Sequence, residues 1–274
     1  MAEYKRWAIE SIKDALGMWR TVFIAGVRQC GKTTLARQMA LENSVMRSLD
    51  DTALLNVAKI DPAGFVARRD VRTMIIDEVQ KAPMLIPEIK RMADISSEKG
   101  QYLLTGSANL ASLPTVTESL AGRMGMMRLR TLAEGEICGR APDFLARAFA
   151  GDFPAKVAES ESFDKAHILH LAFRGGYPEV LTLSQMQRRR WFKAYLDALL
   201  LHDIRELMDV RAYDVLRRLA EMVFARSSKL FAENEITTAL GIKHETYVRF
   251  MAILKTLYLI EEIPHGAMGT MPPR

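Results

Sequence analysis

The sequence predicts an α/β protein, in which a parallel β-sheet with helices on both faces is followed by a helical region and a winged helix-turn-helix. Three observations predict this fold. A glycine-containing segment, residues 26–33, separates a β-type stretch from a helix-type stretch. Short apolar stretches then alternate with helical patterns as far as Arg140, which is typical of a parallel sheet covered on both faces. Residues 212–263 hold a helix, a glycine turn, a longer helix and a strand-like stretch.

The first half of the chain supplies the expected sheet and its helices. Residues 4–19 form one helical face, which carries Ala8, Ile12, Ala15, Leu16 and Trp19. Apolar runs predict the strands, at residues 21–25, 45–49, 71–76, 101–104 and 124–129. Helical spacing and flanking prolines predict the helices between them, at residues 34–43 and 83–97. Ligands of such a sheet bind at the carboxyl ends of its strands.

Residues 26–33 are a complete G-x-x-x-x-G-K-[ST] phosphate-binding loop, or P-loop, in the strand-loop-helix context that its chemistry needs. Its backbone N–H groups and the following helix cradle phosphates, Lys32 reaches the β- and γ-phosphates, and the Thr33 hydroxyl ligates Mg²⁺. The loop residues predicted to bind the nucleotide are Gly26, Arg28, Gln29, Cys30, Gly31, Lys32, Thr33 and Thr34. The chain is therefore predicted to bind a nucleoside triphosphate.

The strand at residues 71–76 ends in two carboxylates, Asp77 and Glu78. A carboxylate at this edge of a sheet, beside a phosphate loop, holds Mg²⁺, and this role suits Asp77. The next carboxylate can polarise the attacking water, and this role suits Glu78. The pair favours an ATPase over a nucleotide kinase or a GTPase. Residues 61–64 match the D-x-x-G of GTPase switches, but the sequence has no N-K-x-D segment that reads guanine.

Two further polar positions complete the predicted site. Thr105, Ser107 and Asn109 follow the strand at residues 101–104 and are candidates for a sensor of the γ-phosphate, although a strand exit also uses such residues to satisfy backbone groups. Arg123 lies at a turn before a strand and could reach a phosphate in its own subunit or a neighbour's. The predicted catalytic residues are Lys32, Glu78, Ser107 and Arg123, and the predicted metal ligands are Thr33 and Asp77.

Composition limits the class of protein. The 274 residues are 49% hydrophobic, which excludes global disorder. The longest uncharged run, residues 100–117, is interrupted by Gly, Ser, Asn and Pro and is no membrane span. Cys30 and Cys138 give no disulfide framework, so we expect a cytoplasmic protein. Cys30 precedes a helix N-terminus, where a thiolate is favoured. Without C-x-x-C or H-E-x-x-H patterns, Mg²⁺ is the only metal implied.

The helix-turn-helix pattern suggests a partner. In a DNA-binding interpretation, one helix would face the major groove with Lys243, His244, Thr246, Tyr247 and Arg249. Residues 206–274 carry nine basic and nine acidic residues, so this region has no net charge. Neutral charge favours the alternative, in which the fold is a packing or lid module.

The motifs together resemble one family, the predicted AAA+-superfamily ATPases of bacteria and archaea that carry a C-terminal domain of unknown function. The matching stretches are residues 4–6, 26–35, 49–51, 61–62, 76–83, 104–108, 119–123 and 175–179. The resemblance implies an ATP-binding AAA+ core, then helices and a winged helix. With the patterns along the chain, this predicts a P-loop AAA+-type ATPase domain over residues 1–140, a helical lid or linker over 141–205, a winged-helix domain over 206–263 and an irregular tail over 264–274. The resemblance also implies Asp77 and Glu78 as the hydrolysis pair and Arg123 as an arginine finger or sensor.

One departure from the family limits what the resemblance implies. Family members usually continue into a further α/β region that resembles a nuclease-like fold, whereas residues 264–274 resemble neither part. We expect an ATP-hydrolysing regulatory or motor module that uses Mg-ATP. The alternative is an ATP-dependent binding switch with negligible turnover, whose winged helix contacts DNA or a protein partner. A homo-oligomer is compatible with both interpretations.

Overall fold

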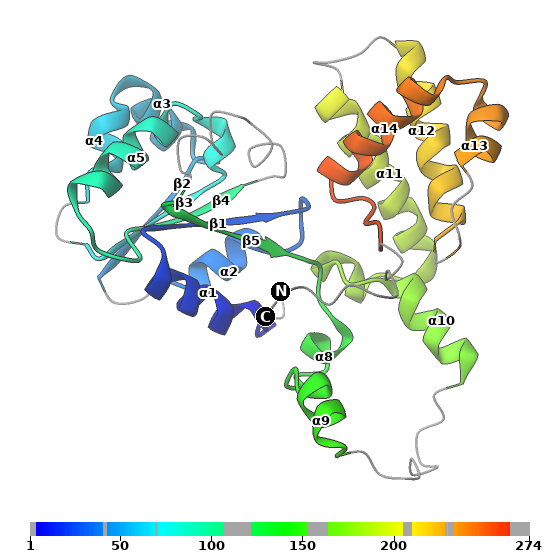
Figure 1. The fold of residues 1–274 in the computed structure, drawn as a ribbon, viewed down its shortest axis with the longest axis horizontal. Helices are drawn as coiled ribbons and strands as arrows, with labels where there is room; N and C mark the ends of the chain where they lie inside the picture. The colour runs from blue at the N-terminus through cyan, green and yellow to red at the C-terminus, as the bar shows by residue number, and fades with distance from the viewer. Residues whose placement is uncertain are drawn as a thin grey trace, which may run out of the picture. The chain divides into compact units, whose positions relative to one another are not determined.

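The computed structural model (Figure 1) divides into two compact units, Met1–Ala194 and Tyr195–Arg274. The residues that it describes are 4–40, 43–68, 71–106, 122–152, 164–204, 210–227, 229 and 233–263.

The first unit contains the parallel sheet that the sequence predicts. Its five strands are β1 (Thr21–Gly26), β2 (Ser44–Ser48), β3 (Thr73–Asp77), β4 (Tyr102–Gly106) and β5 (Met124–Leu129). Their order across the sheet is β2-β3-β4-β1-β5, and each neighbouring pair is parallel. All five carboxyl ends therefore lie at one edge of the sheet, so the segments that follow the strands meet there.

Burial of the strands follows from their place in the sheet. β1 and β4 lie inside the sheet and every residue in them is buried, whereas the edge strand β2 is only half-buried. A central strand of a parallel sheet is covered on both faces, so its apolar residues are consecutive rather than alternating. The run Val22, Phe23 and Ile24 shows this pattern, with each side chain fully buried.

Helices cover both faces of this sheet. In Figure 1, α1 (Ala8–Met18) and α2 (Lys32–Gln38) lie on one side, and α3 (Thr52–Ile60), α4 (Pro62–Val66) and α5 (Leu85–Ile95) lie on the other. Asp61 accepts a hydrogen bond from the Gly64 amide and caps α4, which begins at Pro62. The D-x-x-G segment is thus a helix start.

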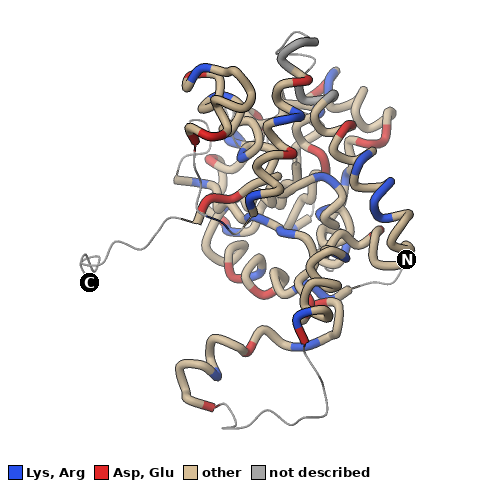
Figure 2. Tube along the Cα trace, turned by 90° about the vertical axis from the view of Figure 1, so that its right-hand side faces the viewer, with Lys and Arg blue, Asp and Glu red and all other residues tan. Residues whose placement is uncertain are grey.

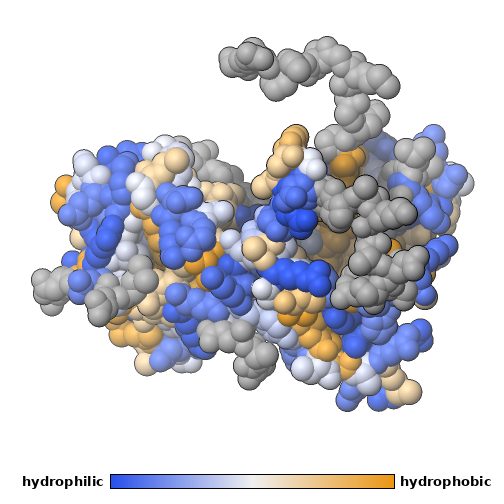
Figure 3. Space-filling view, turned by 90° about the horizontal axis from the view of Figure 1, so that it is seen from below, coloured by the Kyte–Doolittle hydropathy of each residue, from blue (hydrophilic) through white to orange (hydrophobic). Residues whose placement is uncertain are grey.

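Short elements complete the first unit after β5. They are α8 (Glu134–Ile137), α9 (Phe144–Ala150), α10 (Lys165–Arg174), the 3₁₀ helix η2 (Pro178–Thr182) and the first part of α11 (Gln185–Ile204). Neither α9 nor α10 contains a buried residue. Their exposed apolar side chains include Phe144, Leu145, Phe149, Ile168 and Phe173. The space-filling view in Figure 3 shows hydrophobic surface of this kind among hydrophilic patches.

The second unit is helical. It contains the rest of α11, with α12 (Val210–Ala225), α13 (Glu233–Leu240) and α14 (His244–Thr256). Its core is apolar and includes Leu216, Leu219, Ile236, Phe250 and Leu254. Gly241, with φ of 63°, makes the turn between α13 and α14. The helix, glycine turn and helix of the predicted motif are therefore present.

The prediction of a strand at residues 259–263, which would form the wing, is wrong. Residues 259–263 are irregular, and the described part of this unit contains no strand. Leu259 and Ile260 instead pack, partly buried, against the helical core. A single apolar run needs a second strand to hydrogen-bond with, and here its apolar side chains contribute to helix packing. The described fold is a helix-turn-helix without a wing.

Candidate nucleotide-binding site

The phosphate loop lies at the carboxyl end of β1 and leads directly into α2. The loop requires glycine at its two motif positions for different structural reasons. Gly31 has φ of 98°, a left-handed conformation that a side chain strongly disfavours. At Gly26 a Cβ atom would lie 2.5 Å from the Leu129 carbonyl oxygen, so only glycine fits against β5. The loop shape therefore requires glycine at both positions.

Lys32 lies inside the loop. Its side chain is only 4% exposed, and its ammonium group donates hydrogen bonds to the Gly26 and Val27 carbonyls at 3.0 Å each. The ammonium group is thus held by two neutral carbonyls, which phosphate oxygens can replace as acceptors because the lysine side chain is long and flexible. Arg28 and Gln29 are exposed at the loop tip, and Thr34 is exposed in the first turn of α2.

Asp77 is the centre of the polar site. Its carboxylate is 0% exposed and accepts hydrogen bonds from Thr33 at 3.0 Å, Ser48 at 3.1 Å and Thr105 at 2.5 Å. These hydroxyls come from α2, β2 and β4, so three different elements meet at the end of β3. The sequence predicted that Asp77 and Thr33 share a site, and the structure brings them together.

The register of the sheet explains this convergence. β3 lies between β2 and β4, and Ser48 pairs directly with Asp77 in the parallel register. On the other side Ile76 pairs with Leu104, which places the next residues, Asp77 and Thr105, side by side. Sequence reasoning missed Ser48. Its position as the last residue of the strand beside β3 was the signal that could have identified it.

Glu78 follows with a strained backbone. It has φ of 59° and ψ of 42°, a left-handed conformation that is uncommon for a residue with a side chain and that occurs often at functional sites. Its amide donates to the Thr105 hydroxyl at 3.2 Å, and its carboxylate accepts a hydrogen bond from the side-chain amide of Gln80. Glu78 is therefore fixed on both its backbone and its side chain. Gln80 is a second residue that the motifs did not identify.

Of the three sensor candidates, only Thr105 can be placed. It is buried at the end of β4 and contacts both members of the carboxylate pair, through the Asp77 side chain and the Glu78 amide. Ser107 and Asn109 lie outside the described residues.

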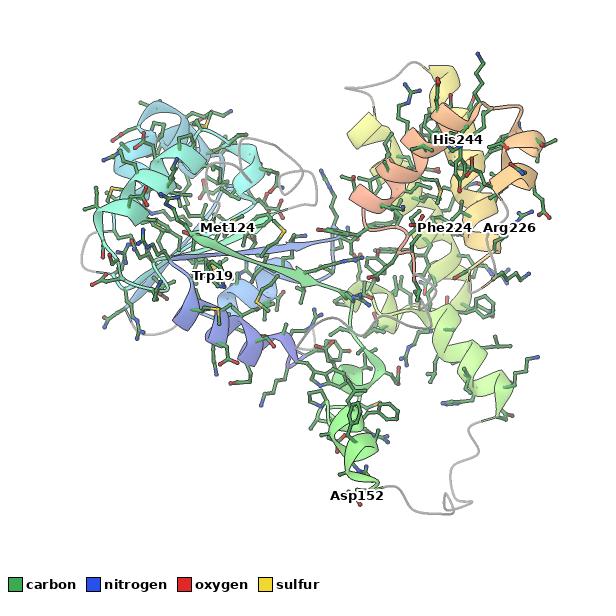
Figure 4. All side chains as sticks on the ribbon, viewed as in Figure 1. Trp19, Met124, Asp152, Phe224, Arg226 and His244 are labelled. Atoms are coloured by element: carbon green, nitrogen blue, oxygen red, sulfur yellow. The ribbon has the colours of Figure 1, made fainter. Side chains whose placement is uncertain are left out.

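Arg123 is not part of this cluster. It precedes β5, and Thr21 pairs with Met124, so Arg123 lies at the amino edge of the sheet, where Figure 4 labels Met124. The phosphate loop lies at the other end of the six-residue strand β1, about 20 Å away. Arg123 pairs there with Asp94 at 2.5 Å, and this hydrogen bond lowers the pKa of the Asp94 carboxyl. The structure therefore does not bring Arg123 to the phosphate loop of its own chain.

Cys30 corrects one expectation. Its thiol is fully buried and lies 3.6 Å from the Leu129 carbonyl oxygen. Burial raises the pKa of the Cys30 thiol, although Lys32 and Arg6 act in the opposite direction. The expectation of a favoured thiolate is wrong because removal from water costs the anion more than the nearby cations return.

The oxygen atoms around Asp77 are suited to Mg²⁺. Magnesium prefers hard oxygen ligands and is held by one or two protein side chains together with phosphates. Thr33 and Asp77 supply a hydroxyl and a carboxylate next to the phosphate loop. The described residues contain no cluster of three or more His, Cys, Asp or Glu side chains that could hold a metal without such further ligands. Among the same residues, no helix has the length and apolarity that a membrane span needs.

Comparison with known families finds a match in each half of the chain. The model of an AAA domain matches residues 19–138, and the model of a domain of unknown function, DUF8612, matches residues 165–270. Two uncharacterised proteins, from Mycobacterium bovis and Mycobacterium tuberculosis, are each 24% identical to this chain over 262 residues. The match covers 94% of this chain and 53% of each relative, so the chain spans about half the length of these curated relatives.

A solved structure shares the fold. The Walker-type ATPase of Pyrococcus abyssi aligns with a TM-score of 0.52 and 13% sequence identity, over 93% of this chain and 90% of its own. At this identity the likeness concerns the fold alone. The two model matches agree with the resemblance that the motifs carry, and this structure agrees with the fold. The chain therefore has a P-loop ATPase fold, is similar to an AAA domain over residues 19–138 and is similar to a domain of unknown function over residues 165–270.

Proposed function

We propose that the first unit binds Mg-ATP at the phosphate loop and hydrolyses it. The observation that carries the proposal is the buried Asp77 carboxylate with three hydroxyl donors, placed beside a loop that already contains the Lys32 ammonium group. A buried carboxylate surrounded by oxygen donors has little use in folding alone. Next to a P-loop it suits a hydrated divalent cation.

The residues divide the chemistry among them. Lys32 would exchange its carbonyl partners for β- and γ-phosphate oxygens, because an ammonium group prefers an anionic acceptor. Thr33 and Asp77 would hold Mg²⁺, which neutralises phosphate charge when it is bound. Glu78 would accept the proton of the attacking water. Thr105 hydrogen-bonds with the Asp77 carboxylate and with the Glu78 amide, so it would link the position of Asp77 to that of Glu78.

Nucleotide binding is tested by thermal unfolding. Wild-type protein should gain about 2.7 kcal/mol of stability with Mg-ATP at a hundredfold excess over Kd. Lys32→Ala should lose this gain, because it removes the side-chain cation on the phosphates. Lys13→Ala is the matched control, since it removes the same charge from an exposed pair with Glu10 on α1. An equal gain of stability with Mg-ATP in all three proteins would show that ATP binds away from this loop.

A second candidate function is an ATP-dependent binding switch with negligible turnover. The observation in its favour is the hydrogen bond from Gln80 to the Glu78 carboxylate, which occupies the proposed base. Steady-state ATPase measurements with and without DNA separate the two functions. Phosphate release above background supports hydrolysis, and tight binding without release supports the switch.

The partner of such a switch would bind the helix-turn-helix of the second unit. Two of the basic side chains there form ion pairs: Arg226 with Glu235 at 3.2 Å, and Lys255 with Glu262 at 2.7 Å. His244, labelled in Figure 4, pairs with Glu233. Figure 2 shows acidic and basic residues interspersed along the trace. DNA binding relies on an excess of positive charge, so these pairs and the zero net charge of residues 206–274 favour a protein partner over DNA.

A further inference from the structure

A buried ion pair lies directly behind the phosphate loop, and no motif of the loop accounts for it. Arg6 and Glu136 are each only 6% exposed, and the Arg6 Nε atom donates to the Glu136 carboxylate at 3.0 Å. Arg6 precedes α1 and Glu136 belongs to α8, so the two residues are 130 positions apart in sequence. Buried pairs of this kind are costly to form unless further hydrogen bonds satisfy both partners.

The guanidinium group of Arg6 uses its three nitrogens on three different acceptors. Besides Glu136, Nη1 donates to the Cys30 carbonyl at 2.8 Å, and Nη2 donates to the Arg130 carbonyl at 2.7 Å. Cys30 belongs to the phosphate loop, and Arg130 follows the end of β5. Arg6 thus ties the loop to the neighbouring strand exit and to α8.

Glu136 is itself held in place by backbone groups. One carboxylate oxygen accepts from the Trp7 amide at 2.7 Å, and the other accepts from the Ala133 amide at 2.9 Å. The carboxylate therefore has three donors from two segments of the chain. Because its own position is fixed, it can fix the plane of the Arg6 guanidinium group.

The hydrogen bond to the Cys30 carbonyl sets the direction of one loop amide. In a trans peptide the carbonyl of one residue and the N–H of the next point in opposite directions. With the Cys30 carbonyl bound to Arg6, the N–H of Gly31 must point away from Arg6. A Cβ at Gly31 would lie 3.4 Å from Arg6 Nη1 and 3.9 Å from Pro178, so the loop backbone rests closely against both.

We propose that Arg6 is a positioning residue for phosphate binding: it orients the peptide between Cys30 and Gly31 so that this amide is available to the nucleotide. The inference rests on the proposed ATP-binding function. Arg6 acts through the loop backbone, so its effect should concern the β-phosphate contacts that ATP and ADP share. Geometry matters here as well as charge, because a lysine ammonium group cannot span three acceptors as a planar guanidinium group does.

The test compares Arg6→Gln and Arg6→Lys with a control that destabilises the same sheet elsewhere. Tyr102→Phe removes a buried hydrogen bond, from the Tyr102 hydroxyl to the Val66 carbonyl at 2.9 Å, at the amino edge of the sheet. For each protein the thermal midpoint without nucleotide is measured, together with Kd for Mg-ATP and Mg-ADP well below that midpoint.

Both Arg6 variants should bind ATP and ADP more weakly by a similar factor of at least about ten, as expected for an uncompensated charge-assisted hydrogen bond. Tyr102→Phe should lower the thermal midpoint and leave both Kd values unchanged. If Arg6→Gln does not fold, Arg6→Lys against the same control decides the matter.

Three results would overturn the inference. Affinity retained in Arg6→Lys would mean that only the charge matters. A loss confined to ATP would place Arg6 at the γ-phosphate. If Tyr102→Phe lowers the thermal midpoint as much as an Arg6 variant does and weakens nucleotide binding by the same factor, Arg6 is a purely structural residue. Failure of the wild type to bind either nucleotide would instead contradict the proposed function itself, because the Arg6 comparison presupposes a measurable wild-type Kd.

Discussion

Replacing Asp77 by asparagine separates the folding role of this side chain from its role in binding Mg²⁺. Asparagine has nearly the same shape but carries no charge, and an amide group replaces one carboxylate oxygen. In the structure, one oxygen of Asp77 accepts from Thr105 at 2.5 Å, and the other accepts from Thr33 at 3.0 Å and Ser48 at 3.1 Å. In Asp77→Asn, the new amide nitrogen would face the hydroxyls on one of these two sides.

The cost to folding should be small. A hydroxyl both donates and accepts, so those facing the new amide can turn and accept from it. Each remaining hydrogen bond loses only its charge assistance, about 1 kcal/mol. Removing a fully buried negative charge offsets part of this loss, because burial of an anion is itself unfavourable. We therefore expect the free energy of unfolding without nucleotide to change by at most about 2 kcal/mol.

The cost to Mg²⁺-dependent binding should be larger. Loss of a carboxylate that orients or ligates a metal typically lowers metal affinity by about 10- to 100-fold. The assay is a titration of MgCl₂ at fixed ATP, with nucleotide binding as the readout and EDTA as the metal-free reference. Asp77→Asn should shift the half-maximal Mg²⁺ concentration upward by this factor and leave metal-free binding unchanged.

Asp94→Asn is the matched control. It makes the same chemical change in the same unit, but Asp94 faces Arg123 and Arg20 at the amino edge of the sheet. It should leave the Mg²⁺ titration unaltered. An unchanged titration in a folded Asp77→Asn protein, or an equal shift in both variants, would refute the assignment of the metal site to Asp77.

Three further outcomes are expected. Glu78→Gln should bind Mg-ATP as the wild type does and hydrolyse it at least about a hundredfold more slowly; wild-type turnover would exclude Glu78 as the base. Because burial raises its pKa, Cys30 should be alkylated slowly at neutral pH, and Mg-ATP should slow the reaction further; equal rates would place the nucleotide away from the thiol. If Arg123 serves a neighbouring subunit, Arg123→Ala should lose about 10³-fold in turnover, and mixing it with Lys32→Ala should restore part of the activity. No rescue would leave Arg123 a structural partner of Asp94.

The sequence predicted those parts of the site that depend on neighbours along the chain. The phosphate loop and the pair Asp77 and Glu78 are local patterns, because each needs only a strand before it and a fixed spacing within it. Ser48 is different. Ser48 meets Asp77 only because β2 pairs with β3 in one register, and that register is a property of the folded sheet.

Two errors show where local rules fail. The apolar run at residues 259–263 has the composition of a strand, but composition does not supply a pairing partner, and Leu259 and Ile260 pack on helices instead. Cys30 has the favourable position of a helix N-terminus, but its burial against β5 dominates its pKa. In both cases tertiary packing outweighs a short-range preference. The position of Arg123 could have been inferred, because a residue just before a parallel strand lies at the amino edge, opposite the ligand.

Lys32 and Arg6 hold the phosphate loop in different ways, and this difference separates their expected effects. Lys32 donates to the Gly26 and Val27 carbonyls, bonds that it must give up if it is to reach phosphate. Arg6 donates to the Cys30 carbonyl behind the loop, and that bond can persist when the loop is filled. Lys32→Ala should therefore remove the ammonium charge that the triphosphate needs. Arg6→Gln should leave the Lys32 charge in place and loosen the loop backbone that presents the amides. The loop needs both, because an ammonium group can follow the phosphates as they move, but only a fixed peptide can offer its N–H in advance.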